Sequence, residues 1–360
     1  MSRALVARGP GEDPKIEEIV LPALGPRDVK VKIAAAGVCH SDLSMINGTV
    51  RPSYPVVLGH EASGTVVEVG PDVHDLEPGT PVVLNWAPPC RTCWFCLHGE
   101  PWLCRAVEGV VSTPGPTLAD GSPVDIALGV GAFSEEVVVG RNGVVPIPEG
   151  IGLDIAAVMG CAVLTGMGAV RNTADVRSGD SVVVFGLGGI GLSAIAGARL
   201  AGASTLIAVD VSEDKAELAR AFGATDFLVS DGSVAKSIRK LTSGRGADHA
   251  FECVGKPVTI RAAWSSTRRG GQCTIVGVGS VADEVTFHAM ELFHFARTLT
   301  SSVFGSSDPE RDIPILAEHV RSGHVDLSPM ITERTDLDGI VDAFKRMESG
   351  QGARTLVEFA

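Results

Sequence analysis

The most specific chemical signal in this sequence is a run of four cysteines spaced Cys-x2-Cys-x2-Cys-x7-Cys: Cys90, Cys93, Cys96 and Cys104. Four thiolates in a short loop can complete a tetrahedral shell around zinc. A complete shell leaves no position for water or substrate, so the predicted role of this zinc is structural. Ferredoxin cluster motifs share the first spacings but end Cys-x3-Cys-Pro, whereas here the last interval is seven residues and Arg105 follows.

Three further potential metal ligands lie far apart in the chain: Cys39, His60 and Cys161. Two cysteines and one histidine, with a fourth position left to water or substrate, form one known type of catalytic zinc site. Each residue alone also has a simpler interpretation. A lone cysteine is often a small buried apolar residue, and a lone histidine is often a hydrogen-bonded core residue. Spacing alone therefore leaves this second site open.

A glycine-rich turn follows one predicted strand and opens a predicted helix: Gly186-Leu187-Gly188-Gly189-Ile190-Gly191. In this context the pattern is typical of dinucleotide binding, because the glycines allow a tight turn and a close approach to pyrophosphate. The phosphates would lie at the helix N-terminus, where unpaired N–H groups favour an anion. Asp210 follows the next predicted strand, where a carboxylate accepts hydrogen bonds from ribose and repels a 2′-phosphate. No arginine comes directly after it, so the pattern predicts NAD rather than NADP.

Two kinds of framework are expected to position these residues. Up to about Pro148, short Val-rich runs alternate with Gly/Pro turns, which predicts an irregular, mostly β domain. Its predicted strands are Val29–Ile33, Gly64–Val69, Pro81–Leu84 and Glu136–Val139.

After about Val163, predicted strands alternate with predicted helices, which indicates βαβ units and a parallel sheet, and so an α/β fold. The strands are Ser181–Phe185, Thr205–Val209, His249–Cys253 and Gln272–Val276, with helices at Ile190–Leu200 and Lys215–Phe222. The last part of the chain is expected to contain helices Ile313–Ser322 and Leu337–Glu348 and a strand Thr355–Phe359.

Length and composition fit a globular enzyme of two domains, since 360 residues with 45% hydrophobic content are long for one core. The formal net charge of -13 disfavours nucleic acid or anionic membrane as a partner. The apolar stretch Ser181–Val209 contains the glycine-rich turn and is interrupted by Arg199, so we do not expect a membrane span. Met1–Gly11 lacks the apolar core of a signal peptide, so a cytoplasmic location is expected, where clustered cysteines favour metal over disulfides.

Together these motifs resemble those of the zinc-containing alcohol dehydrogenases of the medium-chain dehydrogenase/reductase superfamily, over essentially the whole chain. The resemblance rests on Gly37-Val38-Cys39-His40-Ser41-Asp42, Gly59-His60-Glu61, the four-cysteine loop, Gly160-Cys161 with Thr165-Gly166, and the glycine-rich turn. It implies a GroES-like catalytic domain at 1–162 and 304–360. A doubly wound Rossmann domain that binds NAD is implied at 163–303.

The resemblance also implies roles for single residues. The catalytic zinc would be bound by Cys39, His60 and Cys161, with Asp42 and Glu61 orienting and modulating the site. Cofactor contacts beyond the glycine-rich turn and Asp210 are implied at His40, Thr165, Lys215 and Arg354. Lys215 would contact the ribose and Arg354 the pyrophosphate. A histidine at position 40, where some members carry arginine, would hold phosphate less firmly and speed NADH release.

The implied reaction is hydride transfer between an alcohol and NAD, in which zinc lowers the pKa of the bound alcohol. Ser41 corresponds to the first hydroxyl of the family's proton relay. Ser44 stands where many members continue the relay with a histidine, so the terminal base stays open between water and His40. Trp86 occupies the position of an aromatic pocket wall, which favours a flat, apolar primary alcohol, benzylic or allylic.

Several alternatives stay open. The nearest is a formaldehyde dehydrogenase acting on a glutathione or mycothiol adduct, although glutathione-dependent members carry an acidic residue where Gly48-Thr49-Val50-Arg51 has none. NADH could also stay bound and be reoxidised by an external acceptor. A non-catalytic NAD-binding relative, or a zinc-free quinone reductase, would be expected to lack the zinc ligands, and all seven are present. Because relatives assemble through the nucleotide-binding domain, a homo-oligomer is expected, with a dimer favoured over a tetramer.

Overall fold

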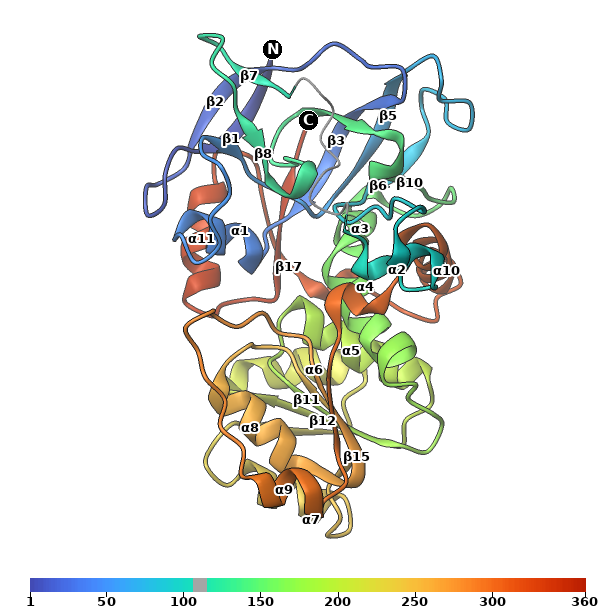
Figure 1. Cartoon of the computed structure of the whole chain (residues 1–360), viewed down its shortest axis with the longest axis vertical. Coiled ribbons are helices and arrows are strands. Elements are labelled where there is room, and N and C mark those ends of the chain that lie inside the picture. Colours follow the sequence, from blue (N-terminus) through green and yellow to red (C-terminus); the bar gives the residue numbers. More distant parts are fainter. Residues whose placement is uncertain (106–114) are drawn as a thin grey trace. The chain divides into compact units, whose positions relative to one another are not determined.

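The computed structural model describes residues 1–105 and 115–360, and its contacts divide the chain into two compact units (Figure 1). Unit 1 consists of Met1–Cys161, Asp308–Gly323 and Ile331–Ala360. Unit 2 consists of Ala162–Ser307 and His324–Met330. The N-terminal and C-terminal segments of the chain therefore belong to the same unit, and unit 2 is formed mainly by one continuous segment.

Unit 1 is built on a seven-stranded sheet whose central strand is β3 (Asp28–Gly37). One edge of β3 pairs with β5 (Ala62–Val69) along its length. The other edge is shared: its first half pairs with β9 (Glu136–Gly140) and its last residues pair with β18 (Arg354–Glu358). The sheet continues through β6, β10 and β17, which are Pro81–Leu84, Val144–Pro146 and Ile331–Thr335.

The alternation of apolar residues explains why β3 forms at the centre. Val29, Val31 and Ile33 are fully buried, whereas Lys32 between them is exposed, so one face of the strand packs on the core. The strand predicted at Val29–Ile33 is confirmed and extends further at both ends. Its extension over small residues up to Gly37 carries the chain directly to Cys39.

A smaller five-stranded sheet has the order β7-β2-β1-β4-β8, with bounds Thr117–Leu118, Lys15–Val20, Ser2–Ala7, Val56–Val57 and Asp125–Ile126. The α-helices of unit 1 are α1 (His40–Ile46), α2 (Trp94–Leu97), α3 (Leu153–Ala157), α10 (Pro309–Arg321) and α11 (Ile340–Glu348). The expectation of an irregular, mostly β half up to about Pro148 is confirmed.

Unit 2 is built on a six-stranded sheet with the order β13-β12-β11-β14-β15-β16, in which every neighbouring pair is parallel. Its strands are Asp226–Val229, Thr205–Asp210, Ser181–Phe185, Ala247–Glu252, Thr267–Ile275 and Thr298–Ser301. From β11 the chain builds outward through β12 and β13, then returns to the other side of β11 for β14 to β16. This reversal defines the doubly wound arrangement that was predicted.

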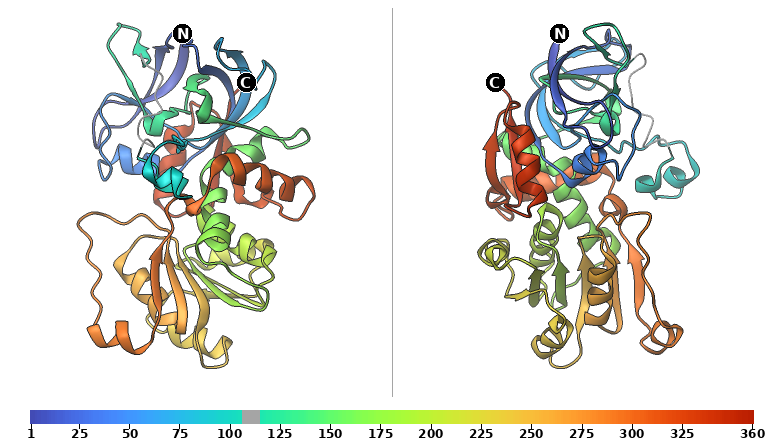
Figure 2. Two further views of the ribbon diagram at one scale, coloured as in Figure 1. Left: turned by 45° about the vertical axis from the view of Figure 1, so that its right-hand side comes forward. Right: turned by 90° about the vertical axis from the view of Figure 1, so that its left-hand side faces the viewer.

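Helices cover both faces of this sheet, as the two views in Figure 2 show. α5 packs with α6 and α7 packs with α8, while α5 and α8 contact the central strands. The helices are α4 (Ala162–Gly168), α5 (Gly189–Leu200), α6 (Ala216–Phe222), α7 (Val234–Leu241), α8 (Pro257–Ser266) and α9 (Ala289–His294). Val183, Phe185 and Trp264 lie in the core between the sheet and α8.

Some boundaries differ from the sequence predictions. β14 and β15 begin earlier than the predicted strands His249–Cys253 and Gln272–Val276, because their parallel ladder already starts at the pair Ala247–Thr267 and continues after an irregularity. The short strands β13 and β16 were not predicted. Thr298–Ser301 has only one apolar residue, so it shows no hydrophobic run.

Among the described residues, no single helix is long and apolar enough to cross a membrane. One bent pair of consecutive helical segments, Leu153–Gly160 with Ala162–Thr173, would together be long and apolar enough, judged by length and composition only.

Because β3 lies at the centre of the sheet, a substitution that shortens one of its buried side chains should destabilise the protein. Val31→Ala removes two fully buried methyl groups, and we expect it to lower the free energy of unfolding by about 2 kcal/mol. The same substitution at Val67, which is 41% exposed on β5, should cost less than about 0.5 kcal/mol. Urea denaturation of both variants measures the difference. Equal shifts of the two midpoints would contradict the placement of β3 in the core.

Candidate metal and cofactor sites

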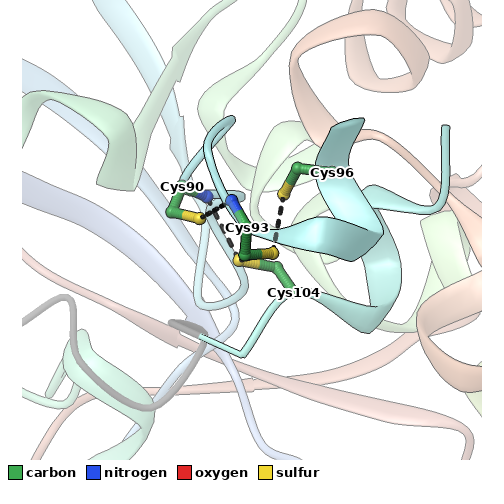
Figure 3. A group of neighbouring side chains, drawn as sticks. All are labelled: Cys90, Cys93, Cys96 and Cys104. Carbon is green, nitrogen blue, oxygen red and sulfur yellow. Dashed lines mark hydrogen bonds between the residues drawn. The ribbon is translucent and has the colours of Figure 1, made fainter. Parts of the chain in front are cut away.

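The four-cysteine loop folds so that its sulfur atoms gather at one point (Figure 3). The Sγ atoms of Cys93 and Cys96 are 3.6 Å apart, and those of Cys93 and Cys104 are 3.9 Å apart. All four ligand atoms lie within 4.8 Å of one another. All four residues are free thiols rather than disulfides. The prediction that these cysteines form one metal-binding cluster is therefore confirmed in geometry.

The surroundings shift the pKa values of these thiols in different directions. The hydroxyl and backbone N–H of Thr92, with the N–H of Cys93, lower the pKa of Cys90 to about 5. Burial raises the pKa of Cys96 to about 12. Such crowded sulfurs repel one another as thiolates unless a cation neutralises them, and a divalent metal with a preference for sulfur satisfies that requirement.

An ion-pair network that the sequence did not reveal anchors this loop. Arg91 has a positive φ of 61° and directs its guanidinium to the start of α10. It donates hydrogen bonds of 2.6 and 2.7 Å to the Asp308 carboxylate and one of 2.6 Å to Glu310. These partners are 217 and 219 residues away in the chain, so no local motif could indicate them.

Cys39, His60 and Cys161, which are dispersed in sequence, meet in unit 1. Cys39 is the N-cap of α1, two residues after the end of β3; His60 lies just before β5, and Cys161 follows a short 3₁₀ turn. All three are buried, with their ligand atoms within 4.8 Å of one another. The Sγ of Cys161 is 3.3 Å from the Nε2 of His60. The fold thus assembles the three-ligand set that spacing alone left open.

Asp42 holds His60 in place from the opposite side of the ring. Its Oδ1 is 3.2 Å from His60 Nδ1 and also accepts a 2.9 Å hydrogen bond from the N–H of Gly59. Burial alone would lower the pKa of His60, but the charges of Asp42 and Cys39 raise it well above its ordinary value. With Nδ1 engaged by Asp42, Nε2 is the nitrogen directed at the two cysteines, as metal-binding histidines require.

A buried ion pair lies behind Cys39. Arg354 donates two hydrogen bonds of 3.0 Å to Glu61 and one of 3.2 Å to the carbonyl of Val38. Its Nη2 is 3.8 Å from Cys39 Sγ. A hydrogen bond from Cys161 and the charge of Arg354 lower the pKa of Cys39 well below its ordinary value. The structure places Arg354 against Glu61 and Cys39, whereas its contact with pyrophosphate stays a prediction.

Ser41 and Trp86, for which a relay and a pocket role were predicted, lie beside this cluster. The Oγ of Ser41 is 3.9 Å from Cys39 Sγ, and the side chain is half-buried. The indole of Trp86 meets the ring of His60 edge-on, with centroids 6.2 Å apart. Ser44 is half-buried on the same helix as Ser41, and its carbonyl accepts the N–H of Val50.

The glycine-rich turn and Asp210 are joined in unit 2. Gly186 has a φ of 88°, and a Cβ on Gly191 would lie 1.9 Å from the carbonyl oxygen of Gly186. Glycine is therefore required where α5 starts against β11. Asp210 accepts hydrogen bonds from the N–H of Leu187 at 2.8 Å and of Ser212 at 3.1 Å. One carboxylate thus links the turn after β11 to the end of β12.

The remaining predicted cofactor contacts have different surroundings. Thr165 is buried in α4, and His40 is exposed at the start of α1. Lys215 is 9% exposed, and burial lowers its pKa although the charge of Asp210 opposes this. Their roles in NAD binding stay predictions.

Comparison with known proteins agrees with this geometry. Residues 25–149 match the alcohol dehydrogenase GroES-like domain, and residues 189–320 match the zinc-binding dehydrogenase family. S-(hydroxymethyl)glutathione dehydrogenases of Photobacterium damsela subsp. piscicida and Escherichia coli O1:K1 are each 38% identical, covering 99% of this chain and 100% of theirs.

Solved structures give the same result. An alcohol dehydrogenase zinc-binding domain protein from Burkholderia ambifaria superposes with a TM-score of 0.94 at 30% identity. Benzyl alcohol dehydrogenase from Acinetobacter calcoaceticus superposes with a TM-score of 0.92 at 27% identity. Both comparisons cover 100% of this chain and 99% of the other.

The parallel sheet with its glycine-rich turn, together with the two metal-binding clusters, defines a zinc-binding dehydrogenase. The chain belongs to the zinc-dependent alcohol dehydrogenases of the medium-chain dehydrogenase/reductase superfamily. Zinc and NAD are its cofactors, and its substrate is a small molecule. The expected fold class and family are confirmed.

If the contact between Asp42 and His60 orients the imidazole, its loss should weaken zinc binding. Asp42→Asn removes the charge that orients the imidazole, so we expect one zinc per chain to bind roughly 10- to 100-fold more weakly. Zinc retention against a chelator, read by elemental analysis, measures this. Asp72→Asn, on an exposed side chain of the same unit, is the control and should retain both ions. Unchanged retention in Asp42→Asn would contradict the orienting role.

Proposed function

We propose that this protein is an NAD-linked alcohol dehydrogenase that reversibly oxidises a primary, apolar alcohol to an aldehyde. The observation that carries the proposal is the aromatic ring of Trp86 beside the Cys39–His60–Cys161 cluster. This arrangement combines a metal-binding set with an apolar wall at one place. An alcohol held there would have its hydroxyl at the cluster and its carbon chain against the indole.

The donor set fits zinc. Two sulfur atoms and one imidazole nitrogen converge, and His60 is held by Asp42 in the orientation that directs Nε2 inward. Cys39, His60 and Cys161 would hold the catalytic ion, and the four-cysteine loop would hold the structural one. When bound, zinc supplies Lewis-acid chemistry that lowers the pKa of an alcohol hydroxyl.

The chain's own residues would then handle charge and protons. The Arg354 guanidinium lies close enough to Cys39 to stabilise its thiolate, and Glu61 balances that guanidinium. The hydroxyl of Ser41 would accept the alcohol proton, and its 3.9 Å distance from Cys39 Sγ supports this role. Beyond Ser41 the side chain of Ser44 cannot act as a base near neutral pH, so the proton would pass to water or to the exposed His40.

The cofactor would bind at the carboxyl edge of the parallel sheet in unit 2. The turn Gly186–Gly191 would receive the pyrophosphate at the N-terminus of α5, and Asp210 would accept hydrogen bonds from the adenosine ribose. We also propose Thr165, Lys215, His40 and Arg354 as further cofactor contacts. Assembly into a homo-oligomer, first of all a dimer, and a cytoplasmic location are proposed on the resemblance to the family.

A second candidate activity is oxidation of an S-(hydroxymethyl) thiol adduct. It is favoured by the 38% identity to S-(hydroxymethyl)glutathione dehydrogenases over nearly the whole chain. The segment Gly48-Thr49-Val50-Arg51 argues against glutathione as the thiol, since it lacks the acidic residue of glutathione-dependent members. Mycothiol is the other thiol of this class.

The pocket assignment is tested with Trp86→Ala. Loss of the aromatic wall should lower kcat/KM for benzyl alcohol relative to ethanol by roughly tenfold, because apolar contact with the ring is removed. Trp94→Ala, on a tryptophan that is 61% exposed on α2, is the matched control and should leave the ratio unchanged. NADH absorbance gives both rates. An unchanged ratio in Trp86→Ala would remove Trp86 from the pocket.

The same assay decides between the two activities. Formaldehyde is supplied as oxidisable substrate without thiol, with glutathione and with mycothiol, in parallel with benzyl alcohol. Turnover of benzyl alcohol that is independent of thiol supports the alcohol dehydrogenase. Activity with formaldehyde only when one thiol is present, at a kcat/KM well above that for any simple alcohol, would replace it with the second candidate.

A further inference from the structure

Glu252 is a buried carboxylate that none of the proposed roles uses. It is the last residue of β14 and has 0% exposure. Its Oε1 accepts hydrogen bonds from the N–H of Val254 and Gly255, both at 2.9 Å, and from the hydroxyl of Thr259 at 2.6 Å. Its Oε2 accepts a second bond from the Gly255 N–H at 3.1 Å. In the part of the chain that the structure describes, it forms no ion pair.

The backbone of the same residue holds a second loop. The carbonyl oxygen of Glu252 accepts hydrogen bonds from the N–H of Val276 at 2.7 Å and of Gly277 at 2.9 Å. Val276 and Gly277 follow directly after β15, the next strand of the sheet. Glu252 therefore bonds to the loops that follow two neighbouring strands. Its side chain accepts hydrogen bonds from the loop after β14, and its backbone carbonyl accepts them from the loop after β15.

These two loops contact each other through backbone, without intervening side chains. A Cβ on Gly277 would lie 2.2 Å from the nitrogen of Gly255, and a Cβ on Gly255 would lie 2.4 Å from the carbonyl oxygen of Val278. The first loop in turn contacts the glycine-rich turn, because a Cβ on Gly186 would lie 2.5 Å from a methyl carbon of Val254. The three loops form a continuous rim at the carboxyl edge of the sheet.

The sheet order says which end of the cofactor this rim faces. Asp210, proposed to bind the adenosine ribose, ends β12 on one side of β11, whereas β14 and β15 lie on the other side. A dinucleotide in a doubly wound fold lies across the carboxyl edge at the point where the strand order reverses. If the adenosine lies on the β12 side, the nicotinamide nucleoside of the same dinucleotide reaches the ends of β14 and β15.

We propose that Glu252 is a positioning residue for the nicotinamide half of NAD, acting through the loops Cys253–Lys256 and Val276–Gly279. This inference rests on the proposed placement of NAD at the glycine-rich turn and Asp210. A carboxylate suits the site better than an amide, because both oxygens accept and every partner is a donor. Because Gly255 N–H bonds to both oxygens, a glutamine would turn its NH2 group toward that donor in either orientation.

The test compares ligands that share the adenosine end and differ at the other. Wild type and Glu252→Gln are titrated by calorimetry with NADH and with ADP-ribose, which lacks nicotinamide. We expect Glu252→Gln to bind NADH roughly tenfold more weakly, since the new NH2 group would face the Gly255 N–H, donor against donor, and ADP-ribose within about twofold of wild type. The same variant should raise KM for NAD more than it lowers kcat.

Two further variants complete the design. Thr259→Val removes the 2.6 Å hydrogen bond to Glu252 and the 2.9 Å contact with the carbonyl of Lys256, which belongs to the same loop. It should shift NADH binding in the same direction by roughly threefold, which keeps the test valid if Glu252→Gln does not fold. Asp248→Asn is the control: it lies on the same strand at the amino end, where it accepts hydrogen bonds from Ser181. It should leave the ratio of NADH to ADP-ribose affinity unchanged even if stability falls.

Equal weakening of NADH and ADP-ribose in Glu252→Gln, or no weakening of either, would overturn the positioning role. A wild-type protein that binds NADH while ADP-ribose fails to compete with it would instead overturn the proposed adenosine site, and the inference with it. The two failures are distinguished by the wild-type titration alone.

Discussion

The buried pair of Glu61 and Arg354 is the interaction on which the metal-binding cluster of unit 1 depends. Neither charge reaches solvent, so each needs the other to offset the loss of hydration. The geometry that satisfies them fixes β18 beside β3, because Arg354 opens β18 and also bonds to the carbonyl of Val38. Cys39 follows Val38 directly, so the register of two strands determines where the first cysteine of the cluster lies.

At the other sites, too, one acidic residue connects two parts of the chain. Asp42 uses one oxygen for both Gly59 and His60, Asp210 links two strand ends, and Glu252 holds two loops. In each case an acidic residue within or at the end of an element accepts one or more backbone N–H groups from a neighbouring loop. Backbone donors at loop ends need acceptors in any fold. Here those acceptors belong to acidic residues beside the predicted metal and cofactor sites.

How far the sequence predicted this arrangement depends on the range of each interaction. The four-cysteine cluster and the glycine-rich turn are local, so spacing and hydrophobic pattern were sufficient. Convergence of Cys39, His60 and Cys161 needed the family resemblance, because no local rule joins residues 101 positions apart. The ion pairs of Arg91 and Arg354, and the hydrogen bonds of Glu252, were not predicted. Arginine and glutamate are ordinary surface residues until tertiary structure buries them.

The pairing of β18 with β3 also has a consequence for the order of folding during synthesis. Domains generally form as the chain emerges, the N-terminal part first. Unit 2 consists mainly of one continuous segment and can assemble as soon as that segment has been made. The central strand of unit 1 instead waits for a partner more than three hundred residues later. The thiol of Cys39 therefore stays without the Arg354 guanidinium beside it until translation has reached β18.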